Sequence, residues 1–74
     1  MSEPSNEVKA QIVRQEIVVY ENTRYQFQLR HRVQQALGNE DLCKTIVLEL
    51  EKIERGIDLL EAEVTALGKV AGEG

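Results

Sequence analysis

The chain has 74 residues, of which 42% are hydrophobic and 30% charged, and its formal net charge at pH 7 is -4. A chain of this length is enough for one small domain and buries only about 60% of its unfolded surface, so a partner chain would help its stability. No apolar run suits a membrane span, the start MSEP lacks signal-peptide features, and one cysteine forms no internal disulfide, so we expect a cytoplasmic protein that does not bind membranes.

The first predicted element covers residues 5–37, and two structures are open for it. As a helix it would be capped by Ser5, and no glycine or proline interrupts it before Gly38. As a β-hairpin it would place strands at residues 16–20 and 25–33 around ENTR, which lacks the Gly-containing dipeptides of tight turns. We favour the helix because tertiary packing routinely overrides β propensity. The alternative is a β-hairpin followed by one long helix.

Two apolar faces are expected on this first helix. One face repeats at spacings of three and four and is the expected seam for the second helix: Val8, Ile12, Val19, Leu29, Val33 and Leu37, with Gln15, Asn22 and Gln26 between them. Asn22 and Gln26 are candidates for fixing the helix register, because polar seam residues penalise misaligned pairings. The second face, roughly opposite, carries Val13, Ile17, Tyr20 and Phe27, which one packed neighbour cannot also cover.

The second predicted helix runs from about Glu40 to Leu67. The stretch GNED marks its start, because Gly38 suits the left-handed end of the preceding helix and Asn39 suits the N-cap. An a/d heptad seam follows in Ile46, Leu50, Ile53, Ile57, Leu60, Val64 and Leu67, with Leu42 one turn upstream. Gly56, next to this seam, predicts a close approach of the helices. The helix is expected to end at Gly68, and residues 1–4 and 68–74 to be disordered.

Two long helices joined by two or three residues must run antiparallel, so the predicted fold is all-α, an antiparallel helical hairpin over residues 5–67. A monomer would leave the second face of the first helix and several residues of the second exposed. The interface candidates are Val13, Ile17, Tyr20, Tyr25, Phe27, Val47, Leu48 and Leu59. We expect two hairpins to form a homodimer, or a higher homo-oligomer, as a four-helix bundle.

No group of residues in the sequence predicts catalysis. His31 and Cys43 stand twelve positions apart in different predicted helices, and Arg30 and Arg32 would repel a metal cation from His31. The glycines lack the spacing of a phosphate-binding loop. We therefore predict no enzyme activity, no cofactor and no metal. The expected function is a protein interaction or assembly module, such as an adaptor, subunit or chaperone-like protein, that binds itself and another protein.

A dimeric nucleic-acid-binding regulator is the alternative function. Residues 1–38 carry five Lys or Arg against four Asp or Glu, a net +1, whereas residues 39–74 carry four against nine, a net -5. The candidate contacts to nucleic acid are Arg24, Arg30, His31 and Arg32. With the nearby aromatic residues they could contact phosphates and stack on bases. On a helix, however, they spread around the axis, and the acidic second helix would repel a phosphate backbone.

Overall fold

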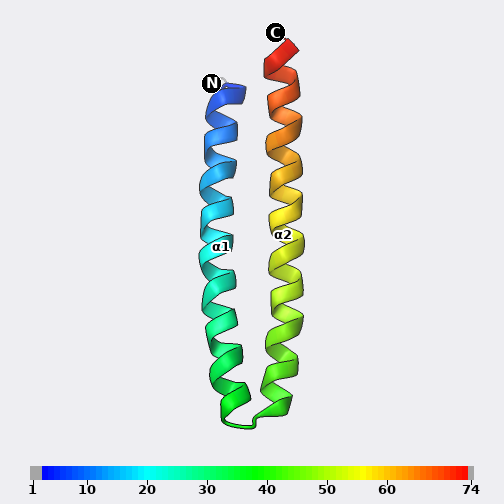
Figure 1. Ribbon diagram of the computed structural model, residues 1–74. Coiled ribbons are helices and arrows are strands. Elements are labelled where there is room, and N and C mark those ends of the chain that lie inside the picture. The colour runs from blue at the N-terminus through cyan, green and yellow to red at the C-terminus, as the bar shows by residue number, and fades with distance from the viewer. Residues whose placement is uncertain (1–2, 74) are drawn as a thin grey trace.

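Two antiparallel helices make up the computed structural model, which describes residues 3–73 and the side chains of residues 3–68. Helix α1 spans Asn6–Ala36 and helix α2 spans Glu40–Glu73. Both chain ends lie at one end of the hairpin and the turn lies at the other (Figure 1). The predicted helical hairpin is confirmed, and the alternative β-hairpin is wrong because all of residues 16–33 belong to α1. The disorder predicted for residues 1–2 and 74 lies outside the described residues.

The turn between the helices depends on Gly38. Its φ of +75° lies in the left-handed region, which glycine adopts without a Cβ clash. The N–H groups of Gly38 and Asn39 donate to the carbonyl oxygens of Gln35 and Gln34 at 3.1 and 3.0 Å. These two hydrogen bonds form a Schellman motif, which satisfies the last carbonyl groups of α1. The predicted roles of Gly38 and Asn39 in the turn are confirmed.

Both helices begin with the side-chain cap that the sequence predicts. The hydroxyl oxygen of Ser5 accepts a hydrogen bond from the N–H of Val8 at 3.2 Å. The side-chain oxygen of Asn39 accepts one from the N–H of Leu42 at 3.3 Å. Each cap satisfies an N–H group that has no partner within its helix, so the start of each helix is encoded locally.

The helix ends differ from the prediction at the carboxyl end of α2. The helix continues through Gly68 to Glu73, so the predicted stop at Gly68 is wrong. A glycine inside a helix costs only about 1 kcal/mol relative to alanine, which is too little to end a helix by itself. Glu3 precedes α1 and is not helical. Its carboxylate forms an ion pair with Lys9 of α1, at 3.1 Å from the Nζ.

Gly38 and Gly68 give a matched test of the positive φ in the turn. Gly38→Ala is expected to lower the free energy of unfolding by about 1 kcal/mol, because a Cβ is strained at positive φ. Gly68→Ala should leave stability unchanged or raise it by up to about 1 kcal/mol, since a Cβ there meets nothing within 4 Å. Urea unfolding followed by far-ultraviolet circular dichroism measures both. Equal effects of the two substitutions would contradict this role of Gly38.

The inner seam of α2 is the apolar stripe that faces α1. It consists of Cys43, Ile46, Leu50, Ile53, Ile57, Leu60, Val64 and Leu67, all buried or half-buried. The predicted heptad seam from Ile46 to Leu67 is thus confirmed. Its predicted upstream member is wrong, because Leu42 is exposed and Cys43 holds the seam position. The Sγ of Cys43 lies 3.9 Å from the carbonyl oxygen of His31 in α1, which places this end of the seam against α1.

The inner seam of α1 is the opposite face from the one predicted. It consists of Asn6, Ala10, Val13, Ile17, Tyr20, Arg24, Phe27, His31 and Gln34, and all but Tyr20 are buried or half-buried. The predicted seam residues Val8, Ile12, Val19, Leu29, Val33 and Leu37 are instead 40–73% exposed. The predicted second face therefore packs on α2, and the predicted seam has no cover in the single hairpin. The physical reason lies in how Tyr20 packs on α2.

Tyr20 of α1 packs directly against Gly56 of α2. A Cβ placed on Gly56 would lie 2.5 Å from Cε2 and 3.0 Å from Cδ2 of Tyr20. The missing side chain thus makes a recess on α2 for the tyrosine ring. This contact confirms the close approach predicted at Gly56, and it fixes which face of α1 turns toward α2.

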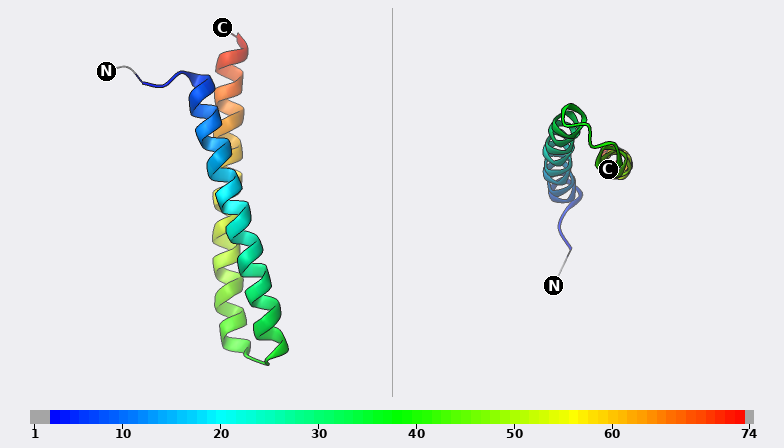
Figure 2. Two further views of the ribbon diagram at one scale, coloured as in Figure 1. Left: turned by 90° about the vertical axis from the view of Figure 1, so that its left-hand side faces the viewer. Right: turned by 90° about the horizontal axis from the view of Figure 1, so that it is seen from below.

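The core of this hairpin is thin. Its extents are 55 × 18 × 18 Å and its radius of gyration is 16.8 Å, whereas a globular chain of this length has about 11 Å. Among the described residues, the buried hydrophobic side chains are Ala10, Ile46, Ile53 and Ile57. Figure 2 shows the helices crossing at a shallow angle with nothing covering their outer sides. Each helix therefore keeps an outer face for other contacts.

Candidate interaction surface

The outer stripe of α1 faces away from α2. We define it as Val8, Ile12, Gln15, Val19, Asn22, Gln26, Leu29, Val33 and Ala36, which follow one another at spacings of four and three residues. All nine are exposed and none is charged. From Val8 to Ala36 the stripe is about 42 Å long at 1.5 Å per residue. It is a second heptad seam on the same helix, on the side opposite the first.

An uncharged outer stripe is unusual for a helix that faces water. The face of an amphipathic helix away from its core normally carries its charged residues. On α1 the charges lie instead beside the inner seam and along the borders of the outer stripe, as with Glu16, Arg30 and Arg32. Val18 and Tyr25, which are 53% and 57% exposed, widen the apolar surface along one border. An exposed surface of this length that is mostly apolar and carries no charge is characteristic of an interface.

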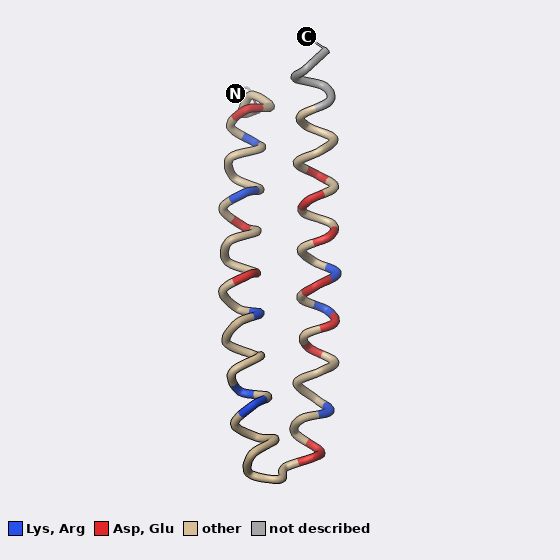
Figure 3. Tube along the Cα trace, viewed as in Figure 1, with Lys and Arg blue, Asp and Glu red and all other residues tan. Residues whose placement is uncertain are grey.

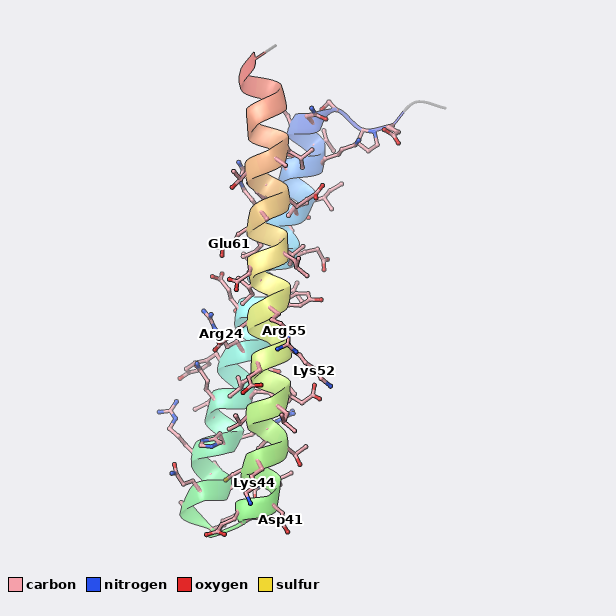
Figure 4. The ribbon with its side chains drawn as sticks, turned by 90° about the vertical axis from the view of Figure 1, so that its right-hand side faces the viewer. Arg24, Asp41, Lys44, Lys52, Arg55 and Glu61 are labelled. Atoms are coloured by element: carbon pink, nitrogen blue, oxygen red, sulfur yellow. The ribbon has the colours of Figure 1, made fainter. Side chains whose placement is uncertain are left out.

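The outer face of α2 differs from that of α1. Leu48 and Leu59 are exposed there, but Lys52 and Arg55 lie between them along the helix. Both cationic side chains project from the outer side of α2 in Figure 4, and Lys52 pairs with Glu49 at 3.3 Å. The exposed apolar residues on the outer face of α2 are therefore separated by charged residues, and α1 carries the continuous uncharged stripe.

The interface candidates from the sequence fall into two groups in the structure. Val13, Ile17, Tyr20 and Phe27 lie on the inner seam of α1, where they face α2. Tyr25, Val47, Leu48 and Leu59 are exposed and remain open to a partner. The register candidates Asn22 and Gln26 are exposed at the middle of the outer stripe, so within one hairpin they align nothing. Any register role for them requires a second helix on that stripe.

The candidate nucleic-acid contacts do not form one patch. Arg24 and His31 are half-buried on the inner seam, and the guanidinium of Arg30 stacks over the ring of Phe27, 5.1 Å from its centroid. Arg32 is exposed on another side of the helix. Figure 3 shows most acidic residues on α2, alongside these basic positions, and Arg24 lies on the inner seam that faces that helix. This arrangement separates the cations and places negative charge beside them.

Among residues 3–73, no three His, Cys, Asp or Glu side chains are placed to hold a metal ion. Within the same residues, neither helix has a stretch long and apolar enough to cross a bilayer. Cys43 is a free, half-buried thiol on the inner seam. The grooves of the hairpin run between α1 and α2. One of them is lined by Gln28, His31, Arg32, Val47 and Leu50.

Comparisons with protein-family models, with curated proteins and with solved structures found no match to this chain. Its candidate surface therefore stands on its own geometry. Most residues of the outer stripe were predicted to form a seam, but the seam that contacts α2. The signal for an outer role was the lack of any charge at these nine positions, together with the neighbouring Val18, which was not among the candidates.

Proposed function

We propose that this protein is a non-catalytic assembly module of the cytoplasm that self-associates through the outer stripe of α1. The observation that carries the proposal is that all nine positions of this stripe are exposed and uncharged. In water such a stripe favours a second helix lying along it, because association removes apolar surface from solvent. A chain with so thin a core also gains stability from a partner.

The mechanism is helix packing along a seam. The outer stripe repeats at heptad spacing, so a partner helix can place its side chains between those of α1 over several turns. α2 holds α1 straight from the opposite side, which orders the stripe before a partner arrives and reduces the entropy lost on binding. The exposed aromatic Tyr25 stands at the border of the stripe and is the best-placed anchor residue, since aromatic side chains dominate many interfaces.

Val19→Lys tests this function. Val19 is 53% exposed in the hairpin, and lysine favours helix more than valine does, so this substitution preserves the helix and places a charge in the stripe. Light scattering at micromolar concentration should give a dimer or larger oligomer for the unmodified chain and a monomer for Val19→Lys. The matched control is Leu48→Lys on α2, also exposed, which should leave the mass unchanged.

Two results would contradict the proposal. One is an unmodified chain that stays monomeric across the micromolar range. The other is an oligomer that withstands Val19→Lys but dissociates in Leu48→Lys, since that would place the contact on α2. Far-ultraviolet circular dichroism of each variant distinguishes loss of association from loss of helix.

A further inference from the structure

We infer that the outer stripe of α1 pairs with the outer stripe of a second copy, with the two α1 helices antiparallel and the two-fold axis midway between Asn22 and Gln26. This inference rests on the proposed function and adds the identity, direction and register of the partner helix. It is carried by the pattern of side chains within the stripe and by the charges along one of its borders.

The stripe is complementary to itself in this register. In an antiparallel helix pair, the a positions of one helix lie opposite the d positions of the other. Gln26 then faces Asn22 of the second copy, and the same contact recurs across the axis, so amides meet amides at the centre. On either side Val19 faces Leu29 of the second copy, and Ile12 faces Ala36 further out. Only the layer of Gln15 and Val33 joins a polar to an apolar side chain.

The charges select the same register. Glu16 and Arg30 lie on one border of the stripe, seven positions before and seven after Thr23. In the pairing described, Glu16 faces Arg30 of the second copy, and this contact occurs twice because of the two-fold axis. Neither side chain takes part in the ion pairs found within the described part of one hairpin, which are Lys9 with Glu3 and Lys52 with Glu49. Both are exposed. The guanidinium of Arg30 lies over the ring of Phe27 in the single hairpin and exchanges this contact for the ion pair between copies.

The competing registers lack this complementarity. Sliding one α1 by a heptad in one direction of the antiparallel arrangement places Lys9 opposite Arg30 of the second copy, which repels at two places. Sliding it by a heptad in the other direction leaves Glu16 and Arg30 without an opposite charge. A parallel pairing places Glu16 beside Gln11 and Arg30 beside Tyr25, and forms no ion pair. It also aligns the dipoles of the two helices in the unfavourable direction. Exposed ion pairs add little affinity, so these pairs set direction and register while the apolar layers supply the attraction.

Charge reversal tests the pairing. Glu16→Arg places two arginines in contact across the interface and Arg30→Glu places two glutamates in contact, so each variant alone should dimerise about tenfold more weakly than the unmodified chain. An equal mixture of the two variants restores opposite charges in both contacts. The mixture should therefore form a heterodimer with the affinity of the unmodified dimer. Sedimentation equilibrium measures all three affinities, and Glu51→Arg on α2 is the matched control for adding positive charge.

Cysteine cross-linking tests the direction independently of charge. In a Cys43→Ser background, Ile12→Cys is made on one set of chains and Ala36→Cys on another. The antiparallel pairing predicts a disulfide in the mixture of the two sets and none in either set alone. Each chain then carries a single cysteine, so an intramolecular disulfide is excluded.

The outcomes separate this inference from the function on which it rests. A dimer that cross-links within each set alone is parallel, and overturns the inference while the assembly function stands. A dimer whose affinity does not respond to Glu16→Arg or Arg30→Glu overturns the register. A chain that is monomeric without any substitution overturns both the inference and the proposed function.

Discussion

Ile57→Ala is expected to lower the free energy of unfolding by about 3 kcal/mol, which is most of the stability of a single hairpin. Ile57 is 5% exposed and is one of the four buried hydrophobic residues among those described. A domain of this length has about 4–11 kcal/mol in total, and a thin core places the hairpin at the lower end of that range. The loss combines the transfer of the missing methyl groups with a cavity that neighbouring side chains fill poorly.

Urea unfolding at fixed protein concentration measures this effect, because association would otherwise change the apparent stability. Leu59→Ala is the matched control, since Leu59 lies two positions away on α2 and is 73% exposed. Its substitution should change the unfolding free energy by less than about 0.5 kcal/mol. Comparable losses in the two variants would show that the inner seam of α2 is not the core.

Gly56→Leu is expected to destabilise the hairpin by about 2 kcal/mol, even though leucine favours helix far more than glycine does. The reason is that any side chain at this position enters the space of the Tyr20 ring, whose Cε2 would lie 2.5 Å from the new Cβ. Either the helices separate locally or the ring swings outward, and both responses expose apolar surface of the seam.

The same substitution should have the opposite sign when the ring is absent. In a Tyr20→Ala background, the leucine of Gly56→Leu fills the vacated space and improves the helix, so stability should rise by about 1 kcal/mol. The coupling between the two positions is then about 3 kcal/mol by a double-mutant cycle. Additive effects would mean that Tyr20 does not occupy the recess at Gly56. Thermal unfolding of the four proteins at one concentration provides the measurement.

The sequence predicts α2 well because one stripe of that helix is clearly more apolar than the rest. Three isoleucines, Ile46, Ile53 and Ile57, fall at heptad spacing among charged residues, and the structure buries all three. The turn is equally local, since Gly38 and Asn39 determine its geometry through their own backbone and side chains. Such features depend on neighbours in the chain and need no knowledge of a partner.

The orientation of α1 could not be predicted in this way. Its two stripes have the same spacing, and the stripe that faces α2 contains Arg24 and His31, so it looks the more polar of the two. Summed hydrophobicity therefore favours the wrong face. The choice depends on shape, because the ring of Tyr20 fits the recess at Gly56. That contact joins residues 36 positions apart, and no local pattern encodes it.

The candidate surface was hidden for a related reason. An apolar stripe in a sequence indicates that the stripe is buried, but it does not identify the element that covers it. The outer stripe was therefore predicted to contact the second helix of the same chain. Once α2 covers the opposite face, the exposure of residues such as Val19 and Val33 points to a contact outside the chain.

The placement of both chain ends at one end of the hairpin has a mechanical consequence (Figure 1). Tension applied between the ends would peel α1 from α2, loading one layer of the seam at a time, first near Ala10 and Leu67 and last near the turn. Layers loaded in sequence yield at a much lower force than layers sheared together. The hairpin is thus suited to packing side by side with other helices in a bundle, and not to carrying a pulling load between its two ends.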